Sequence, residues 1–338
     1  MKGDAISIVE AAYDCGGSRR AWLDALLARV APQLDRGLGV SLSTYAPDMP
    51  PEEVTFDGQS FRPEVVAAAR VMIAAYPEIF HRVMSTGRPY DTPSRAMGLT
   101  PAQARTWSPH VEHMHPLGVH DFVGLAARDP SGHALFFSAP SADLRRPTGA
   151  EVAVWSRIAA HISAGARLRR ALPDAPSGDV SEGAEAVLSA AGAVTHAAAE
   201  AQSCGARESL RVAARAIDRA RSKARSNEDE ALDLWQGLVA GRWSLLDRFD
   251  TDGRRFLVAR RNDPEVTDPR ALTLRERQVL AYTAMGHPVK LIAYSLGISV
   301  STVSSGRRSA MRKLGLRTHA DVARLFAAAA PVEAPGDG

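Results

Sequence analysis

The sequence predicts an α+β protein of several domains, in which antiparallel sheets with helices precede an all-α C-terminal domain. Its 338 residues exceed what one hydrophobic core usually organises. Pairs of β-rich runs around turn residues predict hairpins in the first three quarters of the chain, whereas the last part shows only helical spacing. A Pro- and Gly-rich segment over 172–183 separates the two hairpin-bearing regions as a linker.

The composition excludes several classes of protein. The 45% apolar and 23% charged residues are typical of a globular chain. The two cysteines, Cys15 and Cys204, are too few for a disulfide framework and lack the paired spacing of a zinc site. No apolar run approaches the ~20 residues that cross a bilayer, and the first residues do not read as an export signal. We therefore expect a soluble cytoplasmic protein with no membrane partner.

The first region, residues 1–171, is expected to combine helices with an antiparallel sheet. The turn Asp129–Gly132 between two apolar, β-rich runs is the strongest hairpin signal. The expected elements are helices within 5–32, a strand at 37–45, a second at 54–56, helices from 63 and over 78–84, an irregular stretch at 86–100, and a hairpin over 119–139.

A long helix is expected to leave this region, from Thr148 to about residue 172. Thr148 and Glu151 form a capping-box pattern. Gly165 weakens the helix locally but lets another backbone approach closely. An apolar stripe of about six turns can pack on the sheet of its own domain or against a second subunit. Because the helix leaves the region, we favour a dimer seam. The stripe consists of Val152, Trp155, Ile158, Ile162, Gly165, Leu168 and Leu172. The order of elements over 1–171 resembles a GAF-type sensor or dimerisation domain.

Residues 184–264 predict a smaller module with two hairpins. Short strands flank Ala190-Ala191-Gly192, and a second pair, 243–249 and 254–260, flanks an Asp-Gly turn. Helices are expected at 206–224 and 229–239. The two short strands around the Ala-Ala-Gly turn resemble the opening of a PAS domain. A single long helix stands where PAS domains have their middle helices.

The small net charge of +3 hides a strong partition. Between residues 270 and 325 there are ten Lys or Arg and two Asp or Glu, a net charge of +8, so the remainder carries −5. A basic module on a mildly acidic body predicts a polyanionic partner for that module.

The basic module carries the most informative motif. Thr273 and Glu276 form a second capping box, and the helix that they begin ends at Gly286. A short helix from 288, a turn at Gly297 and a helix capped by Ser299 follow, with a fourth helix at 319–328. A helix, a Gly-containing turn and a capped helix constitute helix-turn-helix geometry.

Six motifs in this module resemble the DNA-binding domain of LuxR/FixJ-type transcription regulators. They are LTLRERQVL at 272–280, Gly286, IA at 292–293, LGIS at 296–299, STV at 301–303 and RKLGLRT at 312–318. The resemblance implies a tetrahelical domain over 270–326 that binds double-stranded DNA, followed by a flexible tail over 327–338. This sequence departs from the family pattern at Ser304 and Gly306, where Lys and His are common in the family. It also departs at Leu291, where the family has a glutamate.

The resemblance also implies roles for individual residues. The helix after Ser299 enters the major groove, where an Arg pairs with a guanine edge and Ser donates or accepts. Phosphate contacts fix the register without reading sequence. Expected base contacts are Ser304, Ser305 and Arg308, and expected phosphate contacts are Lys290, Ser299, Ser301, Thr302, Arg307, Arg312 and Lys313.

The first region contains candidate residues for a sensor pocket and for a metal site. Aromatic and imidazole side chains that can line a pocket are Tyr45, Trp107, His113, His115 and Phe122. The dense imidazoles His110, His113, His115 and His120 suit zinc, another transition metal or haem. They form no helical i, i+4 pair, so we favour a polar loop and expect no metal. The ligand, if the pocket holds one, is unknown from the sequence.

These observations predict a homodimeric transcription regulator whose N-terminal domains sense a signal, with RNA polymerase as a further partner. The alternative is a sigma-factor-like protein, or a DNA-docked protein whose N-terminal domain is an enzyme or a constitutive dimerisation scaffold. No GxxxxGK[ST], HExxH, or GxGxxG after a strand occurs, so we expect no catalytic residues and no enzyme.

Overall fold

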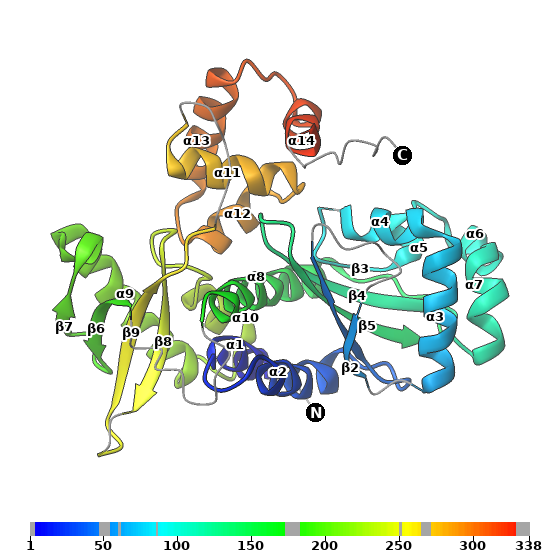
Figure 1. The fold of residues 1–338 in the computed structure, drawn as a ribbon, viewed down its shortest axis with the longest axis horizontal. Helices are drawn as coiled ribbons and strands as arrows, with labels where there is room; N and C mark the ends of the chain where they lie inside the picture. The colour runs from blue at the N-terminus through cyan, green and yellow to red at the C-terminus, as the bar shows by residue number, and fades with distance from the viewer. Residues whose placement is uncertain are drawn as a thin grey trace, which may run out of the picture.

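The computed structural model describes residues 4–46, 55–59, 62–85, 87–172, 183–249, 252–264 and 272–328. Two sheet-bearing units lie on either side of the long helix α8 (Gly149–Ala171), and a helical C-terminal domain stands above them (Figure 1). The predicted α+β class, with antiparallel sheets before an all-α domain, is confirmed. We call residues 4–264, which hold both sheets, the body.

The first unit contains a five-stranded antiparallel sheet with the order β2-β1-β5-β4-β3. The predicted hairpin is present, and its turn is held by Asp129, whose carboxylate accepts the Ser131 N–H at 2.9 Å. The strands are β1 (Ser41–Tyr45), β2 (Thr55–Gln59), β3 (Tyr90–Asp91), β4 (Asp121–Arg128) and β5 (Ala134–Ser141).

Helices cover both faces of this sheet because its strands alternate between two buried sides. Leu42, Leu125 and Phe137 face the main core with α1, α2 and α8, whereas Phe122 and Phe136 face the opposite side. The helices are α1 (Ala5–Tyr13), α2 (Arg19–Leu34), α3 (Pro63–Ala75), α4 (Pro77–Ser85), α5 (Pro93–Ala96), α6 (Pro101–Arg105) and α7 (Ser108–His113).

The stretch expected to be irregular contains two short elements, β3 and α5. Thr92 caps α5, since its hydroxyl accepts the Arg95 N–H at 3.3 Å. A two-residue strand is too short to show a period, and the flanking prolines Pro89 and Pro93 are typical loop signals. Its place at the sheet edge is fixed by pairing with β4.

The second unit has a four-stranded antiparallel sheet with the order β7-β6-β9-β8. Both predicted hairpins are present. Its elements are β6 (Ala184–Ser189), β7 (Val194–Ala197), α9 (Cys204–Arg221), α10 (Glu228–Leu234), β8 (Trp243–Phe249) and β9 (Arg255–Arg261). The helix predicted over 229–239 ends early at Leu234, because Trp235 leaves the helical conformation with φ −98° and ψ 94°.

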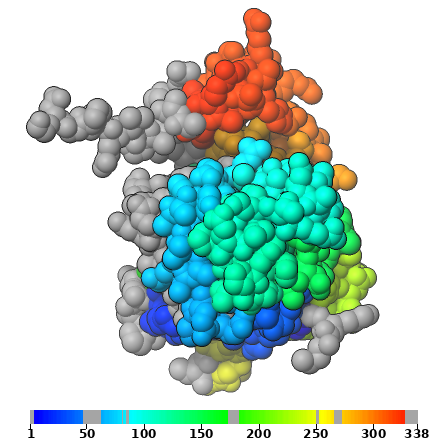
Figure 2. All heavy atoms as spheres, turned by 90° about the vertical axis from the view of Figure 1, so that its right-hand side faces the viewer, coloured from blue at the N-terminus to red at the C-terminus, as the bar shows by residue number. Residues whose placement is uncertain are grey.

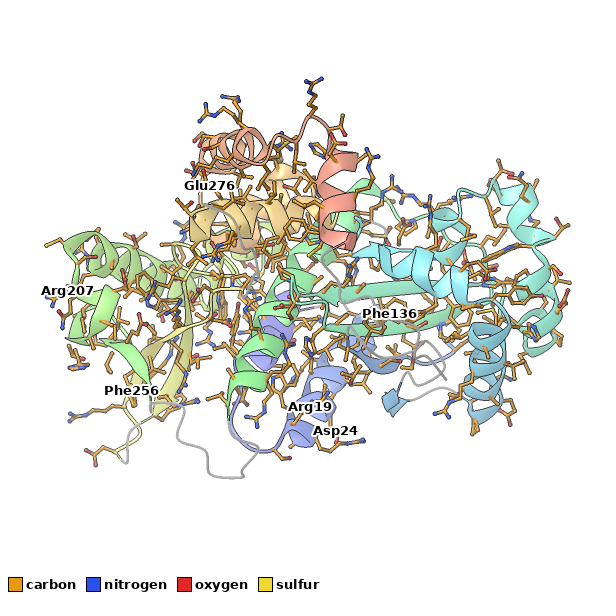
Figure 3. The ribbon with its side chains drawn as sticks, turned by 45° about the horizontal axis from the view of Figure 1, so that its top comes forward. Arg19, Asp24, Phe136, Arg207, Phe256 and Glu276 are labelled. Atoms are coloured by element: carbon orange, nitrogen blue, oxygen red, sulfur yellow. The ribbon has the colours of Figure 1, made fainter. Side chains whose placement is uncertain are left out.

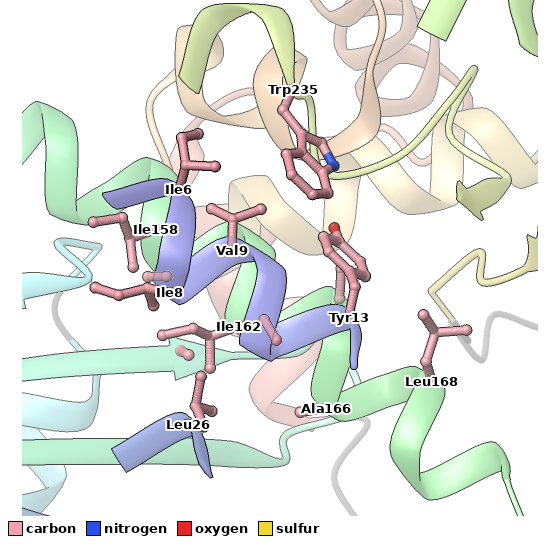
Figure 4. Close-up of a cluster of buried hydrophobic side chains, with 14 of the residues drawn as sticks. Ile6, Ile8, Val9, Tyr13, Leu26, Ile158, Ile162, Ala166, Leu168 and Trp235 are labelled. Atoms are coloured by element: carbon pink, nitrogen blue, oxygen red, sulfur yellow. The ribbon is translucent and has the colours of Figure 1, made fainter. Parts of the chain in front are cut away.

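The two units share one core. A single cluster of buried apolar side chains runs from α1, α2 and α8 into β6, β8, β9 and α10. Figure 4 shows the α1 side chains Ile6, Val9 and Tyr13 between α8 and Trp235. The predicted domain boundary is therefore not a boundary between two cores, although most of the predicted linker, 173–182, lies outside the described residues.

The prediction that the α8 stripe forms a dimer seam is wrong. Trp155, Ile158 and Ile162 are buried within the chain, and the Trp155 ring stacks on Tyr90 at 5.5 Å. The close approach at Gly165 is confirmed, because a Cβ there would lie 2.1 Å from the carbonyl oxygen of Ala12 in α1. The apolar spacing correctly marked a buried face, but the surface that buries it belongs to the same chain.

Candidate DNA-binding surface and sensor pocket

The C-terminal domain consists of α11 (Leu274–Ala284), α12 (Val289–Leu296), α13 (Val300–Lys313) and α14 (His319–Ala328). The capping box of Thr273 and Glu276 is present. Gly297 at φ +61° turns the chain from α12 into α13, and the Ser299 hydroxyl accepts the Thr302 N–H at 3.0 Å. The helix-turn-helix (HTH) prediction is confirmed by this geometry.

The inner face of α13 is fixed by packing. Val303 is buried with Val279, Ile292 and Leu296, and Ala310 is buried in a second small cluster with Leu280. Both clusters hold α13 against the preceding helices, so the opposite face is turned outward.

The outward face carries the residues expected to contact bases. Ser305 and Arg308 are exposed and lie one turn apart, whereas Ser304 is half-buried. The Ser305 hydroxyl donates to the Thr302 carbonyl at 3.1 Å within the helix. The exposed residues expected to contact phosphate are Lys290, Ser299, Ser301, Thr302, Arg312 and Lys313. In Figure 2 the C-terminal domain projects from one end of the molecule, beyond the helices of the first unit.

Two of the expected phosphate contacts also hold the domain together. Lys313 Nζ lies 2.7 Å from Glu276 Oε2, and half-buried Arg307 lies 3.1 Å from His319 Nε2. Glu276, labelled in Figure 3, is buried. The hydrogen bonds from Lys313, Ser309 and the Thr273 backbone lower its pKa to about 2. A phosphate at Lys313 would compete with this carboxylate.

An apolar pocket opens between the first sheet and the helices α3, α4 and α5. It holds ≈ 740 Å³ of space, its open mouth included. None of its lining side chains among the described residues is charged. The lining comprises Ser41, Ser43, Ala69, Met72, Ile73, Tyr76, Ile79, Phe80, Val83, Pro93, Phe122, Gly124, Phe136 and Ser138. Figure 3 labels Phe136 on the sheet side of this space.

Three hydroxyls interrupt the apolar lining on the sheet side, those of Ser41, Ser43 and Ser138. Ser41 is fully buried, and its Oγ has no hydrogen-bond partner among the residues that the structure describes. A buried hydroxyl without a partner is unfavourable by about 1–3 kcal/mol. The pocket thus suits a mainly apolar, uncharged molecule.

The five residues expected to form a pocket are only partly brought together. Phe122 lines the cavity, and the Tyr45 ring lies 5.8 Å from Phe80, which also lines it. The other three, Trp107, His113 and His115, are not among the lining residues. Of these, His113 packs on Tyr76, which lines the pocket, whereas Trp107 packs on His110 and His115 on His120.

Most of the pocket was missed by sequence reasoning. The signal that could have found its floor is the alternation in 41–45, which places Ser41 and Ser43 on one face of the strand and Leu42 on the other. The helix residues Met72 and Phe80 offered no comparable signal, because an apolar helix face is indistinguishable from ordinary core.

The imidazoles are not arranged as a ligand set. His110 is buried between Trp107 and Phe122, with ring distances of 4.7 and 5.8 Å, and burial lowers its pKa to about 4. His115 and His120 lie together at 4.4 Å, whereas His113 lies against Tyr76. Within the described ranges, no three His, Cys, Asp or Glu side chains are grouped to hold a metal ion.

The comparisons with known proteins concern mainly the C-terminal domain. Residues 270–326 match the GerE family, described as bacterial regulatory proteins of the luxR family. This part of the chain is therefore a LuxR-type HTH domain, the DNA-binding domain of a transcription regulator. No curated protein matches the chain. Over the described residues, no helix combines the length and apolarity needed to cross a membrane.

Two solved structures resemble the chain along most of its length. One is the crystal structure of Escherichia coli SdiA in space group P6522, with 14% identity, 92% of this chain and 90% of that chain covered, and a TM-score of 0.29. The other is SdiA in complex with octanoyl-rac-glycerol, with 13% identity, coverage of 92% and 86%, and a TM-score of 0.26.

Proposed function

We propose that the chain is a cytoplasmic, homodimeric transcription regulator that reads duplex DNA through α13 and senses a small molecule in the body. The observation that carries the proposal is the outward face of α13, where Ser305 and Arg308 are exposed on a domain of net charge +8. Arg presents a bidentate donor pair that matches a guanine edge. The basic surroundings supply phosphate contacts that position the helix.

The test is selection of duplex DNA from a random pool by the full-length protein, followed by binding across a salt series. A sequence motif of two related half-sites one helical turn apart is expected from a dimer. Binding is expected to fall about a thousandfold or more between about 50 and 200 mM salt, because several phosphates are neutralised. Binding that is blind to sequence or insensitive to salt would contradict the proposal.

We assign the sensing role to the apolar pocket. Phe122 and Gly124 of β4 face the pocket, whereas Val123 and Leu125 of the same strand face the core shared with α8. A ligand that fits one arrangement of this sheet better than another shifts the population of arrangements. Because α8 packs on β4 and on α12, a change in the pocket has a short packed route to the DNA-binding domain.

The proposed sensing role of the pocket is tested by filling the pocket with a larger side chain. Ala69 lines the pocket from α3, and Ala67, two residues away on the same helix, is exposed. A panel of uncharged apolar compounds is screened by thermal shift and native mass spectrometry. We expect a compound that stabilises the wild type and the control Ala67→Leu but not Ala69→Leu. Equal stabilisation of all three proteins would place the ligand elsewhere, and no stabilisation of any would favour a purely structural body.

A further inference from the structure

The DNA-binding domain is packed directly on the body through α12. Leu291 and Ser295 are buried, and they line a small crevice together with Ala159 and Ala160 of α8 and Arg128 of β4. Leu291 stands where the LuxR-type pattern has a glutamate, and an apolar side chain there suits a surface that is covered. Three further features make this contact specific.

The first feature is a buried hydrogen-bonded cluster that we call the clasp, formed by Tyr13, His161 and Tyr294. His161 of α8 is fully buried, with Nε2 at 2.8 Å from the Tyr294 hydroxyl and Nδ1 at 3.1 Å from the Tyr13 hydroxyl. Burial lowers the His161 pKa to about 3, so the ring is neutral at physiological pH.

The Tyr294 hydroxyl also reaches the end of α10. It lies 2.7 Å from the Leu232 carbonyl oxygen and 2.9 Å from that of Trp235. Carbonyls in the last turn of a helix lack partners within the helix, so a donor from α12 satisfies a group that would otherwise be buried and unpaired. The clasp therefore joins α1, α8, α10 and the DNA-binding domain through two hydroxyls, those of Tyr13 and Tyr294.

The second feature is Arg167, six residues further along α8. Its guanidinium pairs with Asp129 of the first unit, and Nε lies 3.0 Å from both the main-chain and side-chain oxygens of Asn262 in the second. A further hydrogen bond links it to Tyr282 of α11. One buried cation thus contacts both units of the body and the DNA-binding domain.

The third feature is direct contact between the backbone of the HTH domain and the backbone of the body, at glycines where no side chain lies between them. A Cβ added to Gly87 would lie 2.2 Å from the Gly286 carbonyl oxygen, and one added to Gly297 would lie 1.8 Å from that of Leu238. Backbones that touch in this way cannot slide past one another by side-chain rearrangement, so the contact fixes one orientation.

We propose that the clasp and the glycine contacts dock the HTH domain in a single orientation, and that this docking sets the direction in which α13 is presented to DNA. The outward face of α13 stays exposed in the docked arrangement, so docking presents this helix rather than masking it. The docking stands on the structure alone, whereas its effect on DNA rests on the proposed function.

The docking is tested by a distance between two spin labels. Native Cys204 on α9 is exposed and Cys15 is buried, so adding Ala320→Cys, an exposed position on α14, yields one labelled pair. Labelled protein is diluted with unlabelled protein so that only pairs within one chain report. The background with docking intact is expected to give one narrow distance distribution.

Three variants in that background decide the matter. Gly87→Ala drives a methyl group into the Gly286 backbone, and Tyr294→Phe keeps the ring but removes the hydroxyl of the clasp. Gly149→Ala makes the same chemical change as the first where no atom lies within 4 Å. We expect broad distributions for the first two and the narrow one for the control. A broad distribution in the parent, or narrow ones throughout, would overturn the docking.

DNA binding supplies the second readout, on duplexes selected by the wild type. Loss of a fixed orientation is expected to weaken binding of Gly87→Ala and Tyr294→Phe to a duplex with two half-sites by about tenfold or more, with Gly149→Ala unchanged. Full-strength binding by the two broadened variants would refute the role in presentation. Failure of the wild type to select any duplex would instead refute the proposed function and leave the distance result intact.

Discussion

Glu276 shows how a single side chain serves both folding and the DNA-binding surface. Its carboxylate accepts a hydrogen bond from the Thr273 N–H at the start of α11, and it forms an ion pair with the ammonium of Lys313 at the end of α13. The capping box could be predicted from four consecutive residues, because it is local. The ion pair with Lys313 could not be predicted, because its two residues lie 37 positions apart. From the sequence, Lys313 is therefore expected to contact phosphate only.

The depressed pKa of Glu276 predicts a pH dependence of stability. The folded value is about 2 and the ordinary value is 4.5, so the unfolded chain binds the proton more tightly. The stabilisation is fully present above pH 4.5 and is lost as the pH falls toward 2. Urea unfolding at a series of pH values should show this slope for the HTH domain. Glu276→Gln should reduce the slope within that window; an unchanged slope would assign it to other carboxylates.

Base and phosphate roles can be separated with two exposed arginines on α13. Arg308→Ala is expected to cost about 1–3 kcal/mol at one base-pair position and to relax preference there. Arg312→Ala is expected to weaken all sequences alike and to reduce the salt dependence. Lys313→Ala is a poorer test, because it leaves the buried Glu276 without its ion-pair partner. Repeated DNA selection with each variant measures the difference, and the reverse pattern would mean that the roles are exchanged.

At the scale of elements, the sequence predicted what depends on neighbours along the chain. Caps, Gly stops and β-hairpin turns placed α8, the three hairpins and the four C-terminal helices within a few residues. It did not predict β3, which exists only through pairing with β4, nor the early end of α10, where the next residues turn toward the HTH domain. The α8 stripe was read as a dimer seam because a periodic pattern shows that a face is covered, not by what.

Gly306 lies inside α13, and its replacement by Ala is expected to stabilise the domain by about 1 kcal/mol, since Gly is the poorer helix former. The added Cβ would meet only Val279 Cγ2 at 3.8 Å, an ordinary contact. Gly297→Ala is the opposing control, because φ is +61° there and the Cβ would strike Leu238. Thermal unfolding should shift upward for the first and downward for the second; a downward shift for Gly306→Ala would show that α13 requires glycine.

At the scale of the whole molecule, the shared core predicts that both sheets of the body open together. Hydrogen exchange of the β4–β5 and β8–β9 amides should converge on one opening free energy, because both hairpins bury side chains in the same cluster. Much easier opening of β8–β9 would mean that the two units are separate folding domains after all. The sequence suggested two modules because hairpins are local, whereas the core that joins them is built from residues more than 200 positions apart, such as Ile6 and Trp235.

The side chain of Leu291 bears on whether the HTH domain of this chain could be replaced by that of another LuxR-type protein. A glutamate at this position would place a carboxylate at the covered face of α12, in a space lined by Ala159 and Ala160 of α8 and by Arg128 of β4. We expect a graft of that kind to change the contact between α12 and α8, because burying a carboxylate is unfavourable unless it is paired. The surface of the HTH domain is thus complementary to this body, and the domain is not freely interchangeable. New DNA specificity is best engineered by altering the outward face of α13 alone.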